Sequence, residues 1–100
     1  MAASTDLAER VDADAAQRAA ELAKALADPV RIQLFDVLRR QGAGVCQCEL
    51  QPLFGISQST LSHHLRTLRE AGVVGVQRRG LWAYYYVNDE PLEALRTWLS

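Results

Sequence analysis

The chain has 100 residues, a formal net charge of -1 and 49% hydrophobic residues. This length fits one small domain, and the hydrophobic content excludes a wholly disordered chain. The charge is unevenly distributed, because residues 1–30 hold six acidic against three basic residues, whereas residues 50–88 hold four basic against one acidic. The second half is therefore the one expected to face phosphate.

No apolar stretch is long enough to span a bilayer, and the first residues lack the basic start and apolar run of a secretion signal. We therefore expect a cytoplasmic protein without membrane contact, in a compartment where thiols stay reduced. Cys46 and Cys48 are the only two cysteines. A disulfide between residues i and i+2 would close a very small, strained ring, so a structural disulfide is not expected.

The first predicted element is an alanine-rich amphipathic helix over 5–27. Its apolar face is shallow and suits either packing within the monomer or a dimer contact. Asp28 can cap a second helix that starts at Pro29 and runs to about Gln41, before a glycine-containing segment at 42–44. The face of the first helix is formed by residues at three-to-four spacing, namely Leu7, Val11, Ala15, Ala19, Leu22 and Leu26.

Residues 46–71 have the pattern of a helix-turn-helix. A short helix over 46–54 is followed by a glycine turn and a helix that Ser57 or Ser59 can cap and that runs to about Ala71. Strands over 73–78 and 81–87, joined through Arg79-Gly80, predict a hairpin, and a last helix runs from Pro91 to about Leu99. This order predicts a mainly α fold with a small β-hairpin (α+β). It is a single winged helix-turn-helix domain over 1–100, with the wing at 73–87.

The second helix of the motif, which we call the recognition helix, presents a polar face suited to DNA. A major groove admits one helix, and side chains near its N-terminus reach base edges, while a hairpin tip can meet phosphate or the minor groove. Each feature alone is common on solvated surfaces, so the prediction depends on their order and spacing together. The predicted DNA-binding residues are Gln58, Ser59, Thr60, Ser62, His63 and Arg66 on the helix, and Arg78 and Arg79 on the wing.

His63 and His64 are adjacent, and neighbouring residues on a helix point about 100° apart. They are therefore not expected to bind one metal ion together. We expect one of them to be exposed near phosphate and the other to be partly packed.

Several segments together resemble the ArsR/SmtB-type metal-sensing repressors, over nearly all of residues 20–99. The resemblance implies a homodimeric prokaryotic repressor that needs no cofactor to bind double-stranded operator DNA, with the helices at 5–27 and 91–99 as the dimer interface. Inducer binding would lower its affinity for the operator. The segments are Asp-Pro-Val-Arg-Ile-Gln-Leu (28–34), Cys-Gln-Cys-Glu-Leu (46–50), Ser-Gln-Ser-Thr-Leu-Ser-His-His-Leu (57–65), Leu-Arg-Glu-Ala-Gly (68–72) and Arg-Arg-Gly-Leu-Trp-Ala-Tyr-Tyr (78–85).

Cys46 and Cys48 match the Cys-x-Cys ligands of the arsenic-sensing branch. That branch often has a third cysteine where this chain has Gln51, and cadmium or lead sensors add cysteines from an N-terminal arm, which residues 1–45 lack. Zinc sensors use Asp, His and Glu on the last helix, which here has Glu93 but no histidine. Thiolates select soft metals and metalloids. We therefore expect arsenite or antimonite as inducer, with trivalent organoarsenicals as a variant and the third ligand left open.

Spacing suggests how an inducer would act. Residues i and i+2 on a helix point about 200° apart, so the two cysteines cannot converge on one atom while both are helical. Inducer binding is therefore predicted to unwind or bend the first turn of their helix. This movement would shift the recognition helix, or change the spacing between the two recognition helices of the dimer.

Other interpretations of the cysteines stay open. They could be small buried apolar residues, as in a constitutive architectural DNA binder, or a signal for oxidants. A dithiol oxidoreductase or arsenic reductase is less favoured, because the chain lacks a Cys-x-x-Cys motif and a phosphate-binding loop. No enzymatic function is predicted.

Overall fold

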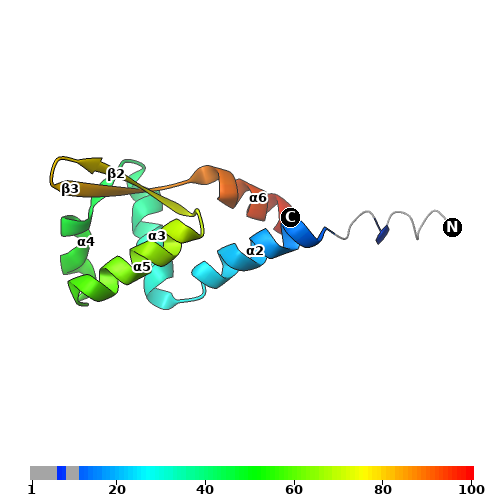
Figure 1. Cartoon of the computed structure of the whole chain (residues 1–100), viewed down its shortest axis with the longest axis horizontal. Coiled ribbons are helices and arrows are strands. Elements are labelled where there is room, and N and C mark those ends of the chain that lie inside the picture. Colours follow the sequence, from blue (N-terminus) through cyan, green and yellow to red (C-terminus); the bar gives the residue numbers. More distant parts are fainter. Residues whose placement is uncertain (1–6, 9–11) are drawn as a thin grey trace.

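The computed structural model describes residues 7, 8 and 12–100. Helices α2 and α6 lie together at one end of the molecule, and the β2–β3 wing and α4 lie at the other, with α3 and α5 between them (Figure 1). The elements are α2 (Ala13–Ala25), α3 (Pro29–Gln41), β1 (Val45–Cys46), α4 (Gln47–Phe54), α5 (Gln58–Glu70), β2 (Val74–Arg79), β3 (Trp82–Val87) and α6 (Asp89–Leu99).

Side-chain caps fix where three of the helices begin. The side chains of Asp12, Asp28 and Ser57 each accept a hydrogen bond from the backbone N–H three residues later in the chain. The donor–acceptor distances are 3.0, 3.1 and 3.1 Å. These bonds satisfy N–H groups that have no partner within the helix. The predicted starts of α3 and α5 are thereby confirmed, and Ser57 rather than Ser59 caps α5.

The predicted continuous helix over 5–27 is wrong at its N-terminal part. Asp12 has an extended backbone, with φ -124° and ψ 99°, and α2 begins only after it. The cause is the capping bond of Asp12, which accepts the N–H of Ala15 and sets the start of α2 at Ala13. Val11, part of the predicted apolar face, lies outside the described residues.

The sheet has three strands in the order β1-β3-β2, all antiparallel, where the sequence predicted a two-stranded hairpin. The additional strand, β1, pairs Val45 with Tyr85 and Cys46 with Tyr84. Two residues are too few to show the alternating pattern of a strand, so sequence periodicity could not reveal it. This strand joins the start of α4 directly to the wing.

The core lies where α3, α4 and α5 meet the sheet. The apolar stripe of α5, formed by Leu61, Leu65 and Leu68, is fully buried, and leucines from α3 and α4 complete the same cluster. Burying one such side chain contributes about 1.5–3 kcal/mol relative to leaving it exposed. The fully buried side chains are Leu34, Leu38, Leu50, Leu61, Leu65, Leu68, Val73 and Val74.

Within residues 7, 8 and 12–100, no helix has both the length and the apolar character needed to cross a membrane.

Candidate functional site

Cys46 belongs to a strand and a helix at the same time. It is the last residue of β1 and the N-cap of α4, with φ -67° and ψ 139°, so its backbone is extended. Its side chain is buried, with 4% of the residue exposed, whereas Cys48, in the first turn of α4, is exposed. One sulfur is therefore held inside the fold and the other faces solvent.

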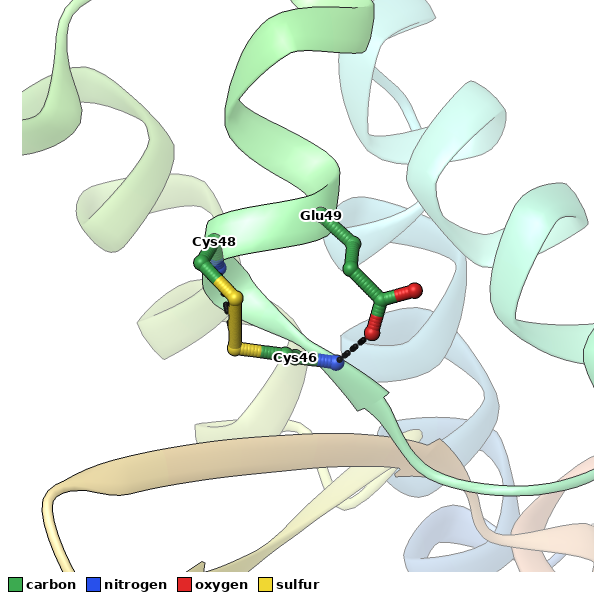
Figure 2. Close-up of a disulfide and its surroundings, with 3 residues drawn as sticks. All are labelled: Cys46, Cys48 and Glu49. Atoms are coloured by element: carbon green, nitrogen blue, oxygen red, sulfur yellow. Dashed lines mark hydrogen bonds between the residues drawn. A yellow bond between two sulfur atoms is a disulfide. The ribbon is translucent and has the colours of Figure 1, made fainter.

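The start of α4 is closed by a reciprocal pair of hydrogen bonds. The N–H of Cys48 donates to Cys46 Sγ over 3.2 Å, and the N–H of Cys46 donates to Glu49 Oε1 over 3.2 Å (Figure 2). This is the arrangement of a capping box, with a sulfur in the place that a hydroxyl usually takes. The reactive atom of Cys46 thus also stabilises the first turn of its helix.

The two sulfur atoms are joined in a disulfide (Figure 2). The expectation that these cysteines would not be bridged is therefore wrong for this structure. The two Cα atoms lie 5.1 Å apart, within the range that a disulfide spans. Cys46 has an extended backbone and only Cys48 is helical, so the side-chain directions of a regular helix do not apply to this pair. The premise that both cysteines are helical and point apart is corrected for the same reason. The sulfurs converge without any unwinding of α4.

The residue between the cysteines contacts the recognition helix. Gln47 Nε2 donates a hydrogen bond to Ser62 Oγ over 2.8 Å. Ser62, predicted to bind DNA, is half-buried and its hydroxyl accepts this bond from α4. The dithiol segment and α5 are therefore connected by a direct side-chain contact that sequence reasoning missed, because helical periodicity gives a residue's face but not its neighbour.

The remaining polar residues predicted on α5 lie on its exposed side. Gln58, His63 and Arg66 are exposed, as are Ser59 and Thr60. The last two share the cap of the helix, because Ser57 Oγ lies 3.2 Å from Ser59 Oγ and donates to Thr60 Oγ1 over 2.8 Å. The start of the recognition helix is thus a fixed set of hydroxyl groups facing solvent.

His63 and His64 differ as predicted in burial. His63 is exposed, while His64 is packed against the start of α3, where its Nδ1 lies 3.4 Å from Arg31 Nη1 and 3.9 Å from Asp28 Oδ2. The backbone N–H of Arg31, which donates to the Asp28 carboxylate, is the main cause that lowers the pKa of Asp28; the nearby His64 and the Arg31 charge lower it further. This cluster anchors the inner face of α5 to α3.

The wing carries two exposed arginines, as predicted. Arg79 lies over the ring of Tyr84, with its Cζ 4.9 Å from the ring centroid, and its Nη2 donates to Gln77 Oε1 over 3.2 Å. Arg78 lines a pocket that also contains the two cysteines. The two basic side chains of the wing therefore have different surroundings, one held on the sheet and the other next to the cysteines.

That pocket, of about 490 Å³, lies between the start of α4 and the wing. The lining residues are Cys46, Gln47, Cys48, Gln51, Pro52, Gln58, Arg78, Leu81, Trp82 and Ala83. In the described part of the chain, no group of three or more His, Cys, Asp and Glu side chains is placed to hold a metal ion.

Helices α2 and α6 contact each other, and apolar side chains on α6 remain open to solvent. Trp98 is 56% exposed and Leu99 is 74% exposed. These are the elements that the sequence analysis assigned to a dimer interface.

A winged helix with an exposed polar recognition helix and a basic wing defines a DNA-binding protein of the helix-turn-helix class. Residues 28–76 match the family described as bacterial regulatory protein, arsR family. The chain is 34% identical to the HTH-type transcriptional regulator MJ1325 of Methanocaldococcus jannaschii, over 79% of this chain and 88% of that protein. It is 39% identical to the arsenical resistance operon repressor of Bacillus subtilis strain 168, over 72% of this chain and 68% of that protein.

Among solved structures, HlyU from Vibrio cholerae N16961 is 27% identical, with a TM-score of 0.74, over 89% of this chain and 94% of that chain. The chain belongs to the ArsR family and is a transcriptional repressor with a winged helix-turn-helix fold. The family resemblance and the fold predicted from sequence are thereby confirmed.

Proposed function

We propose that this repressor binds operator DNA as a homodimer and is released when trivalent arsenic or antimony binds Cys46 and Cys48. The observation that carries the proposal is the meeting of two sulfur atoms at the start of α4, next to a residue that contacts the recognition helix. Soft thiolate ligands suit these elements. The name of the Bacillus subtilis relative, an arsenical resistance operon repressor, supports the same choice.

The binding step needs both thiols reduced. Arsenous acid, As(OH)₃, then exchanges two hydroxyl groups for two sulfur ligands and releases two water molecules, with no change of oxidation state. Cys48 is exposed and forms the first bond, and the buried Cys46 forms the second. The partial positive charge at the start of α4 favours the thiolate forms that attack arsenic.

The signal would travel through contacts that are already formed. Arsenic on Cys46 Sγ engages the atom that accepts the Cys48 N–H, so the first turn of α4 must adjust. Gln47 lies in that turn, and its hydrogen bond to Ser62 would pass the movement to α5. The pairing of Cys46 with Tyr84 gives a second route, from β1 into the wing. This mechanism replaces the predicted unwinding.

A mobility-shift experiment on operator DNA tests the proposal, using reduced protein with and without arsenite. Cys46→Ser is the sharpest variant, because serine is a preferred N-cap residue and keeps the start of α4 intact. It should bind DNA like the wild type and lose its release by arsenite. Release of this variant by arsenite, or failure of arsenite to release the wild type, would contradict the proposal.

Gln47→Ala tests the route to the recognition helix. Both thiols remain, so arsenic should still bind, as measured by the metalloid content of the protein after desalting. The arsenite-induced fall in operator affinity should shrink. An unchanged fall would exclude the Gln47–Ser62 contact as the connection.

The dimer part of the proposal is supported by the exposed Trp98 and Leu99 beside α2. Sedimentation should give a dimer for the wild type and a lower average mass for Trp98→Glu. A wild-type monomer at the concentrations that saturate the operator would contradict it.

A second candidate function is response to oxidants, and the observed disulfide favours it. Closing the disulfide would remove two protons and two electrons from the thiols, to be taken up by an oxidant such as a peroxide. If peroxide releases the operator and arsenite does not, the thiols are an oxidation sensor. Arsenite release from fully reduced protein would instead favour metalloid sensing.

A further inference from the structure

The pocket beside the dithiol has two kinds of wall. Cys46, Cys48 and Pro52 line it from the side of α4, and residues at the tip of the wing line it from the other. On the wing side, Leu81 is 95% exposed and Trp82 is 55% exposed, although both are large apolar side chains. A pocket lined by both a reactive dithiol and exposed apolar side chains suits a ligand with both kinds of chemistry.

The lining offers arsenic no third strong ligand. Apart from the two cysteines, its residues include no Cys, His, Asp or Glu. Gln51 stands on the wall, but its Nε2 donates to the Ile56 carbonyl in the turn before α5, and its Oε1 is buried without a partner in the described part of the chain. The third bond of a trivalent arsenic held by Cys46 and Cys48 is therefore left to a group that the ligand brings with it.

We propose that this group is an organic substituent, and that the inducer is a trivalent organoarsenical whose substituent lies in the pocket against Leu81 and Trp82. The inference rests on the proposed function and names its ligand class. Aromatic substituents are favoured, because rings pair with the indole of Trp82 in stacked or edge-to-face arrangements. Space is sufficient, since an apolar cavity of about 150 Å³ holds benzene and this pocket has about 490 Å³.

The binding step balances without a redox partner once the thiols are reduced. An arsonous acid, R–As(OH)₂, exchanges both hydroxyl groups for Cys46 and Cys48 sulfurs and releases two water molecules. The carbon–arsenic bond stays intact and arsenic stays trivalent. The substituent then meets the wing next to Arg78, one of the predicted DNA contacts, which brings the ligand to the DNA-binding surface itself.

The test compares phenylarsine oxide, which hydrates to phenylarsonous acid, with arsenite. Operator release is measured on protein kept reduced by a phosphine, since a dithiol reductant would compete for arsenic. Aryl arsenicals bind dithiols tightly in any setting, so the decisive quantity is how variants change the ratio of the two half-release concentrations. Trp82→Ala should raise the value for phenylarsine oxide about tenfold or more, as expected for lost contacts in an apolar pocket, and leave the arsenite value nearly unchanged.

Leu81→Ala is the second variant, because a side chain with 95% exposure cannot be needed for the core. Like Trp82→Ala, it should raise the half-release concentration of phenylarsine oxide relative to that of arsenite. Leu53→Ala is the matched control, since Leu53 is an exposed leucine of α4 that is not part of the pocket lining. It should change neither half-release concentration.

The outcomes separate this inference from the proposed function. If both arsenicals release the wild type but Trp82→Ala and Leu81→Ala leave the ratio unchanged, the pocket does not hold the substituent, while the dithiol sensor stands. If neither arsenical releases reduced wild-type protein, the proposed function fails and this inference fails with it.

Discussion

Helices α4 and α5, the two halves of the helix-turn-helix, begin in the same way with different atoms. The cap of α4 is the sulfur of Cys46, which accepts an N–H over 3.2 Å, and the cap of α5 is the hydroxyl of Ser57, which accepts one over 3.1 Å. Sulfur is a weak hydrogen-bond acceptor but binds soft elements and can be oxidised, whereas a hydroxyl is a good acceptor with neither reaction.

Under the proposed function, this difference separates ligand sensing from DNA binding within one helix-turn-helix motif. The cap of α5 is reinforced, because Ser57 Oγ also contacts the hydroxyls of Ser59 and Thr60. The cap of α4 can be engaged by a ligand, and the adjacent Gln47 connects it to α5. The first turn of α5 is held by a hydroxyl cap, whereas the first turn of α4 is held by a sulfur atom that is able to react.

The largest expected effect tests whether the two helices are otherwise equally anchored. Leu50 of α4 and Leu61 of α5 are each 0% exposed. Replacing either by alanine should lower the free energy of unfolding by about 2–5 kcal/mol, because a cavity remains in the core. Urea denaturation measures this. Leu53→Ala, at an exposed position of α4, is the control, and its free energy of unfolding should stay within about 0.5 kcal/mol of the wild type. If Leu50→Ala lowered the free energy of unfolding much less than Leu61→Ala, the two helices would differ in their anchoring as well as in their caps.

The next effect concerns the hydroxyl cap. Ser57→Ala should lower the free energy of unfolding by about 1 kcal/mol, because the Thr60 N–H loses its acceptor. Ser59→Ala is the control, and should cost no more than about 0.5 kcal/mol, since Ser59 does not cap the helix. Equal costs for the two variants would show that the cap of α5 is not where the structure places it.

The sulfur cap predicts a smaller difference, measured on reduced protein. Cys46→Ser should be more stable than Cys46→Ala by about 0.5–1 kcal/mol, because only serine can accept the Cys48 N–H. The reduced wild type should lie between them, since sulfur accepts more weakly than oxygen. If Cys46→Ala is as stable as Cys46→Ser in thermal unfolding, the capping role of this position is contradicted.

The carboxylate cap of α3 extends the comparison to a third atom type and responds to pH. The N–H of Arg31 donates to Asp28 and is the main cause that lowers the pKa of this carboxyl below its ordinary value of 3.8. Because the folded-state pKa is the lower one, the stabilisation is fully present above pH 3.8 and is lost as the pH falls through the folded-state pKa.

Acid titration of unfolding measures this contribution. In Asp28→Asn, the free energy of unfolding should fall less steeply as the pH drops below 3.8. Asp36 is a useful comparison, because hydrogen bonds from the side chains of Arg39 and, to a smaller extent, Arg40 lower its pKa. Asp36→Asn should therefore also make the free energy of unfolding fall less steeply below pH 3.8, independently of Asp28. An unchanged pH profile in Asp28→Asn would contradict the assigned cause.

The helices were predictable because each has an apolar repeat and a start signal. Asp28-Pro29 and Ser57 acted as the caps that their residue types suggest, and Gly42 ended α3 with a positive φ of 70°. Strand β1 was not predictable, since its backbone is fixed by pairing with Tyr84 and Tyr85 far along the chain. The residues of the dithiol could be found from their chemistry, but their convergence could not, because it depends on that pairing.

The position of Cys46 at a helix N-cap has a consequence for how such repressors can diverge. Cysteine and serine codons differ by a single nucleotide, and serine is the better residue for this position of a helix. Under the proposed function, a lineage could therefore lose its response to trivalent arsenic or antimony in one step and keep a stable, DNA-binding protein. The reverse step would restore one ligand just as simply, provided that Cys48 had been retained. Responsive and unresponsive repressors are then neighbours in sequence, with no poorly folded intermediate between them.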